Sequence, residues 1–132
     1  MKCVRCALRA VAASAVLLLA FGAHAADEAS PLDCKPDGNQ QQMNACAVRD
    51  FRAADAALNI RYGEVMKSLS PQQRTALRTE QRAWLKGRDP GCKTAAKSSE
   101  GGSIWPLEFY GCLEQSTRKR TAKLDLWKGR SQ

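Results

Sequence analysis

Apolar residues recur at helical spacing in successive stretches of the chain. The first stretch begins near Gln40, and its apolar positions are Met43, Ala47, Phe51, Ala54, Leu58, Tyr62, Val65 and Leu69. Because these positions lie three or four residues apart, they share one helical face and predict one long amphipathic helix. Gly63 is the only interior position of low helix propensity.

A second helix is predicted to begin directly after the first. Ser70 fits an N-cap, Pro71 the first helical position and Gln73 the third, which together form a capping box. The helix is expected to run to about Arg88, because Asp-Pro-Gly at 89–91 is typical of a turn.

An exposed loop without apolar periodicity is expected over residues 93–103. Pro106 marks the first turn of a third helix, whose inward positions are Tyr110, Leu113, Thr117, Thr121, Leu124 and Lys128, with Leu107 and Trp127 broadening its apolar side. No segment has the alternation of apolar and polar residues that would predict a strand instead of a helix. The sequence therefore predicts an all-α domain of about three helices, the first one long.

Polar residues lie on the apolar faces of these helices. On the second helix, Leu77, Gln81, Trp84 and Arg88 share one face, so that a large aromatic residue is flanked by polar groups. Buried polar groups need partners, and we interpret this face as part of a hydrogen-bond network that sets the register of the helices, with Trp84 as a core anchor. The alternative is that part of the network forms a polar ligand pocket. The expected members are Asp55, Asn59, Tyr62, Gln81, Trp84, Arg88, Thr117 and Arg120.

The N-terminal segment has the pattern of a cleavable signal peptide. Lys2, Arg5 and Arg9 precede an apolar run over 10–22, and Ala-His-Ala at 23–25 supplies a cleavage site. Cleavage after Ala25 predicts a periplasmic or secreted protein, with an irregular lead-in at 26–39 and a helical domain at 40–132. The apolar run is too short to span a bilayer, which takes about 20 residues, and no later segment is a transmembrane candidate.

The predicted mature chain retains four cysteines: Cys34, Cys46, Cys92 and Cys112. An even number in a small exported domain is typical of two disulfides, for which three pairings are possible. We favour Cys34 with Cys46 and Cys92 with Cys112, because these pairs close the two shortest loops. The spacings lack the two close pairs that a zinc site would need, so no metal site is expected.

Charge narrows the class of partner. The full chain has 21 basic and 13 acidic residues, and removal of Lys2, Arg5 and Arg9 leaves 18 basic residues and a net charge of +5. A basic exported domain is attracted to anionic surfaces such as lipid headgroups, lipopolysaccharide or acidic proteins. Nucleic acid is disfavoured by the compartment and by the absence of aromatic residues among the basic ones.

The residues offer little for catalysis. The only histidine, His24, lies in the predicted signal peptide, so nucleophile-histidine pairs and histidine metal sites are excluded from the mature chain. Asp50, Asp55 and Glu64 have arginine neighbours, which is typical of surface ion pairs. We expect no enzymatic activity, no catalytic residues and no cofactor.

Several motifs together resemble the lysozyme inhibitor LprI-like N-terminal domain family, over about residues 34–124. They are Met43-Asn44-x-Cys46, Asp55-x-x-Leu58-Asn59-x-x-Tyr62, Gln81-Arg82-Ala83-Trp84-x-x-x-Arg88-Asp89-x-x-Cys92, Gly101-Gly102-Ser103 and Cys112-x-x-x-x-Thr117-x-x-Arg120-x-x-x-Leu124. The resemblance implies a small disulfide-bonded helical domain of the bacterial envelope. One characterised relative inhibits lysozyme, which makes lysozyme the implied protein partner.

Two functional hypotheses follow. In the first, the protein inhibits a lysozyme by occupying its cleft, where two carboxylates lie. Its basic loop would enter that cleft, and the candidate partner-binding residues are Lys93, Lys97, Gly101, Gly102 and Ser103. In the second, the protein is an envelope binding module that recognises an anionic glycan, lipid or protein without inhibiting lysozyme.

Overall fold

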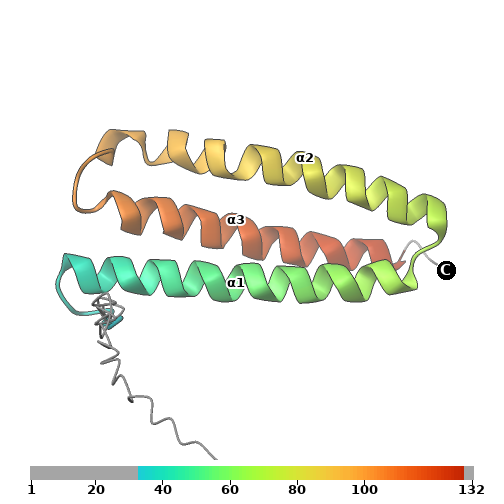
Figure 1. The fold of residues 1–132 in the computed structure, drawn as a ribbon, viewed down its shortest axis with the longest axis horizontal. Coiled ribbons are helices and arrows are strands. Elements are labelled where there is room, and N and C mark those ends of the chain that lie inside the picture. The colour runs from blue at the N-terminus through green and yellow to red at the C-terminus, as the bar shows by residue number, and fades with distance from the viewer. Residues whose placement is uncertain (1–32, 130–132) are drawn as a thin grey trace, which may run out of the picture.

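The three α-helices of the described residues lie side by side (Figure 1). In the computed structural model, which describes residues 33–129, they are α1 (Gln40–Ser68), α2 (Pro71–Ala95) and α3 (Trp105–Lys128), with the short 3₁₀ helix η1 (Lys97–Ser99) before α3. α2 runs opposite to α1 and α3, so α1 and α3 are parallel neighbours. No strand occurs within the described residues. The prediction of an all-α fold with a long first helix is confirmed.

Side-chain caps begin the first two helices. The predicted capping box of α2 is present: Ser70 Oγ accepts the Gln73 N–H at 3.3 Å, and Gln73 Oε1 accepts the Ser70 N–H at 2.9 Å. A second capping box, which the sequence analysis missed, begins α1 with Asn39 and Gln42. Both boxes satisfy backbone N–H groups that have no partner within the helix.

The tightest helix packing is between α1 and α3, whereas α2 contacts its neighbours less extensively. One core cluster lies near the α1–α2 turn and consists of Leu58, Val65, Leu69, Leu77, Leu124 and Trp127. A second cluster lies near the other end and consists of Cys92, Ala96, Phe109 and Leu113. The middle of α2 therefore lies between two apolar clusters, and its inward residues there are largely polar.

The expected end of the second helix at Arg88 is wrong. α2 continues through Pro90 as far as Ala95, and only then gives way to η1. Pro90 removes one helical hydrogen bond, to the carbonyl of Lys86, but Lys86 is exposed and water can satisfy that carbonyl. The last turn of α2 buries Cys92, and this tertiary contact outweighs the local cost of the proline.

Two disulfides link the ends of the helices. Cys34 bonds to Cys46, which ties the segment before α1 to that helix, and Cys92 bonds to Cys112, which joins the end of α2 to the start of α3. These are the two shortest loops that the four cysteines can close. Each loop restricts the unfolded chain and contributes on the order of 3 kcal/mol.

The predicted signal peptide at 1–25 lies outside the described residues, as does the lead-in up to residue 32. Cleavage after Ala25 therefore stays a prediction. Among the described helices, none combines the length and apolar character that crossing a bilayer requires.

Two leucines of α3 provide a test of the core. Leu124 is 0% exposed and Leu126 is 65% exposed. Replacing Leu124 with Ala should lower the free energy of unfolding by about 2 to 5 kcal/mol, because the change leaves a cavity in packed surroundings. Leu126→Ala is the matched control and should change the free energy of unfolding by less than about 0.5 kcal/mol. Urea unfolding followed by circular dichroism measures both, and equal losses would contradict the assigned core.

Candidate functional site

Arg88 is the centre of the polar contacts between the helices. Its side chain is 10% exposed and donates at 2.8 Å to Asp55 of α1 and at 2.8 Å to Asp89 of its own helix. Its guanidinium carbon lies 5.2 Å from the ring centroids of both Phe51 and Trp84, within the range of cation–π attraction. A weaker contact of 3.4 Å reaches Thr117 on α3. Arg88 thus connects all three helices.

The charge of Arg88 is maintained by these partners. Burial opposes the charged form, but the hydrogen bonds to Asp89 and Asp55 outweigh it, so the pKa of Arg88 lies above its ordinary value. The guanidinium is therefore a permanent positive charge at any pH at which the protein folds. It can hold a carboxylate in place, but it cannot exchange protons in a reaction.

Arg120 makes a parallel set of contacts from α3 to α2. It is 4% exposed, donates through Nε to Gln81 Oε1 at 2.8 Å, and donates through Nη1 to Glu80. Its guanidinium carbon also lies 5.9 Å from the centre of the Trp84 ring. Trp84 is partly buried, packs against the apolar cluster near the α1–α2 turn, and has the guanidiniums of both arginines within about 6 Å of its ring centre.

The structure brings together six of the eight predicted network residues: Asp55, Gln81, Trp84, Arg88, Thr117 and Arg120. Asn59 is exposed and takes no part in these hydrogen bonds, and Tyr62 packs against the apolar cluster instead. Sequence reasoning missed Phe51, Glu80 and Asp89. Phe51 lies one helical turn before Asp55, and that spacing could have identified it.

The network is suited to a structural role. Its two buried cations already have carboxylates as partners, and the hydroxyl of Thr117 is fully buried. No cluster of three or more His, Cys, Asp or Glu side chains within residues 33–129 could hold a metal ion. These contacts support the interpretation that the network sets the register of the helices.

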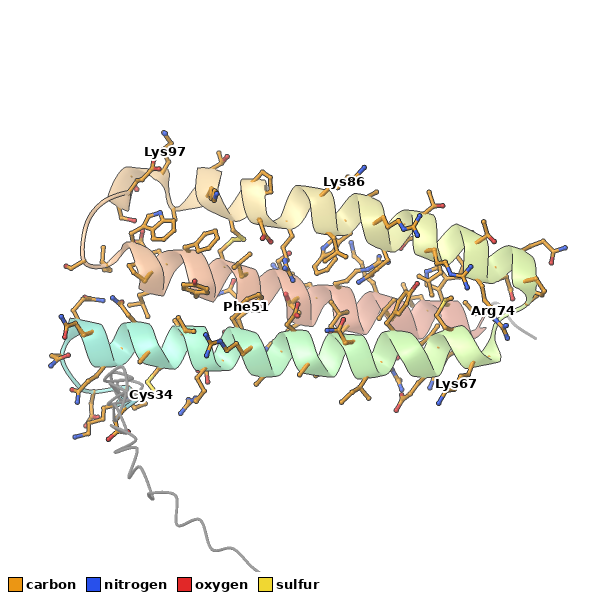
Figure 2. All side chains as sticks on the ribbon, viewed as in Figure 1. Cys34, Phe51, Lys67, Arg74, Lys86 and Lys97 are labelled. Carbon is orange, nitrogen blue, oxygen red and sulfur yellow. A yellow bond between two sulfur atoms is a disulfide. The ribbon has the colours of Figure 1, made fainter. Side chains whose placement is uncertain are left out.

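The predicted partner-binding loop is shorter and more ordered than expected. Lys93 belongs to the last turn of α2 and Lys97 to η1, so only residues 100–104 connect η1 to α3. Figure 2 shows Lys97 extending from the end of the domain, and it forms a 3.2 Å ion pair with Glu100. The expectation of an irregular segment over the whole of 93–103 is therefore wrong, because the disulfide and the burial of Ala96 extend helical structure into it.

The two glycines and the serine of this loop shape its turn. Gly101 has φ of 81°, a conformation that side chains with a Cβ rarely adopt. A Cβ on Gly102 would lie 3.0 Å from the carbonyl oxygen of Ser99, which accepts the N–H of Gly102 at 2.8 Å. The carbonyl of Ser103 accepts a 2.9 Å hydrogen bond from Asn44 on α1. These contacts fix the short connection between η1 and α3, and a partner-binding role for the three residues stays a prediction.

A pocket of ≈ 380 Å³ opens at this end of the domain. It is lined by Lys93, Thr94, Lys97, Glu100 and Trp105, and one side of the Trp105 ring stacks on Phe109 with centroids 4.7 Å apart. A larger pocket of ≈ 690 Å³ lies along α1 beside the Cys34–Cys46 disulfide and contains none of the predicted partner-binding residues. The smaller pocket is hereafter called the lysine pocket.

Comparison with known proteins shows which family the chain belongs to. A family profile described as lysozyme inhibitor LprI matches residues 33–124, which span both disulfides and the whole arginine network. The chain belongs to the LprI lysozyme inhibitor family. The resemblance expected from the sequence motifs is thus confirmed, and it covers nearly all of the described domain.

Two relatives of this LprI-family protein are uncharacterised bacterial proteins. A protein of Rhizobium meliloti (strain 1021) is 37% identical over 130 residues, which cover 89% of this chain and 94% of the relative. YecT of Escherichia coli is 25% identical over 107 residues, which cover 70% of this chain and 66% of YecT. No solved structure matches the chain.

A double-mutant cycle tests whether Arg88 holds α2 to α1. Arg88→Met and Asp55→Ala, made singly and together, should reveal a coupling of about 1 kcal/mol in the free energy of unfolding. This lies below the roughly 1.5 to 3 kcal/mol of fully buried charged hydrogen bonds, because Asp55 is 36% exposed.

The exposed pair Arg49–Asp50 is the control for that cycle. Its coupling should be below about 0.5 kcal/mol, as is usual for ion pairs in water. Chemical denaturation of all variants gives both couplings. If the two were equal, Arg88 would not be what anchors α2.

Proposed function

We propose that this protein is an exported inhibitor of lysozyme that binds the enzyme through the lysine pocket. The observation that carries the proposal is the family match over residues 33–124, since the family is described by lysozyme inhibition. The match includes the residues of the arginine network, in which Arg88 and Arg120 are paired with carboxylates.

The chemistry of the lysine pocket suits the cleft of a lysozyme. That cleft contains two carboxylates flanking the scissile bond, and these attract cations. Lys93 and Lys97 are exposed at the pocket, and Lys97 contacts Glu100, a pair that can open at the cost of a weak surface interaction. Trp105 adds aromatic surface of the kind that often dominates binding energy at protein interfaces.

The backbone around the lysine pocket is held in place before a partner binds. The Cys92–Cys112 disulfide holds α2 to α3 beside the pocket, and the carbonyl of Ser103 is bonded to α1. Because a preorganised surface loses little conformational entropy on binding, few contacts suffice for useful affinity.

Inhibition assays test the proposal. The oxidised mature protein should inhibit at least one lysozyme at micromolar concentration, measured both with suspended cell walls and with a soluble chitooligosaccharide substrate. The soluble substrate separates binding to the enzyme from coating of the walls by a basic protein. Inhibition of wall lysis alone, or no inhibition at all across several lysozymes, would contradict the proposal.

Charge reversal at the pocket locates the contact. Lys93→Glu with Lys97→Glu should weaken inhibition of the soluble-substrate reaction at least tenfold, a loss of about 1.4 kcal/mol, because it places carboxylates opposite those of the cleft. Lys119→Glu with Lys123→Glu changes the net charge equally on the exposed surface of α3 and should alter inhibition by less than about threefold. Equal losses in both variants would show a general charge effect, and no loss in the first would exclude the lysine pocket.

A further inference from the structure

The net charge of the domain is concentrated on one helix. α2 contains six basic and two acidic residues. α1 contains four basic and three acidic residues, and α3 contains five basic and three acidic residues. α2 therefore has a net charge of +4, compared with +1 for α1 and +2 for α3. The attraction of the domain for anionic partners should therefore be strongest along α2.

The buried arginines increase this imbalance at the surface. Of the two acids on α2, Asp89 accepts from Arg88 and Glu80 accepts from Arg120, so both are engaged by guanidiniums that face the interior. The exposed cations of α2 are left without acidic partners. Within residues 33–129, none of the following four forms an ion pair: Arg78, Arg82, Lys86 and Lys93.

These four residues share one side of α2, hereafter the basic flank. Their spacings of four, four and seven residues keep them in register along the helix, over about 22 Å. Leu85, which is 43% exposed, lies at the edge of the same side. Lys86 extends away from α1 and α3 in Figure 2. The basic flank is thus a stripe of cations within about 80° of the helix circumference, with an exposed leucine at its edge.

We infer that the basic flank is a docking surface for a membrane that contains anionic phospholipids. A helix surface is convex, and long basic side chains within about 80° of its circumference can all reach one planar array of phosphates. The flank contains no aromatic residue on which a sugar ring or a base could stack. Each basic residue near an anionic membrane contributes about 1 kcal/mol, and Leu85 is placed to enter the headgroup region.

Vesicle sedimentation tests this inference. The oxidised mature protein should bind vesicles of phosphatidylcholine with 30% phosphatidylglycerol at 0.15 M salt, and should bind pure phosphatidylcholine vesicles weakly. A triple variant with Arg78→Gln, Arg82→Gln and Lys86→Gln should bind the anionic vesicles about a hundredfold more weakly. Lys93 is left unchanged because it also lines the lysine pocket.

A second triple variant provides a control of equal net charge. It carries Lys67→Gln, Lys119→Gln and Lys123→Gln on the exposed surfaces of α1 and α3. Its affinity for the anionic vesicles should fall by less than about fivefold. Circular dichroism must show that both variants are folded. Equal losses in the two variants, or no binding of the unmodified protein to the anionic vesicles, would overturn the inference.

The membrane surface is separable from the proposed inhibition. The triple variant of the basic flank should inhibit hydrolysis of a soluble lysozyme substrate as well as the unmodified protein does. If the protein inhibits no lysozyme but still binds anionic vesicles through the flank, the proposed function fails and this inference stands. Loss of both activities in the flank variant would show that one surface serves both and would contradict a separate membrane-docking role for the flank.

Discussion

The buried charges of Arg88 and Arg120 constrain how α2 can pack against the other helices. A guanidinium stays charged in a folded protein, so its burial is tolerated only where acceptors and ring faces surround it. Arg88 has Asp55, Asp89 and two aromatic rings, and Arg120 has Gln81 and Glu80. A one-residue rotation of α2 turns its side chains by about 100°. It would move Arg88 away from Asp55, and would move Gln81 and Glu80 away from Arg120. The apolar clusters hold the ends of α2, and the arginines set its rotation.

This interior arrangement has a consequence at the surface. The two carboxylates of α2 serve the buried guanidiniums, so the cations on the outer side of α2 have no acids to neutralise them. The positive potential on the outer side of α2 therefore results from the pairing of its two carboxylates with the inward-facing guanidiniums. A replacement of the buried arginines by apolar residues would change the surface charge pattern as well as the packing.

The end of the domain near Cys92 is organised by different forces. There the disulfide, the left-handed turn at Gly101 and the hydrogen bond from Asn44 to Ser103 hold a short connection in place. Membership of the LprI family assigns the whole domain to a group described by lysozyme inhibition, without indicating which surface acts. The lysine pocket and the basic flank of α2 meet at Lys93, and the remaining residues of each lie on different parts of the domain.

Local rules were enough to predict much of this fold from the sequence. Apolar spacing identified three helices, Ser70 and Gln73 marked the start of α2, and short loop closure favoured the disulfide pairing that the structure contains. Each of these depends on residues close together in the chain. The spacing of Arg78, Arg82 and Lys86 is local as well, but their lack of acidic partners is seen only in the tertiary structure.

Only the tertiary structure decided where α2 ends and which polar residues meet. The turn-like sequence around Pro90 predicted a stop, but burial of Cys92 and its bond to Cys112 carry the helix further. Asn59 shares a helical face with Asp55, yet only Asp55 reaches Arg88, because the rotation of α2 against α1 determines which positions lie opposite. Helical periodicity fixes the face that a side chain occupies, whereas the partner across an interface depends on the packing of elements distant in sequence.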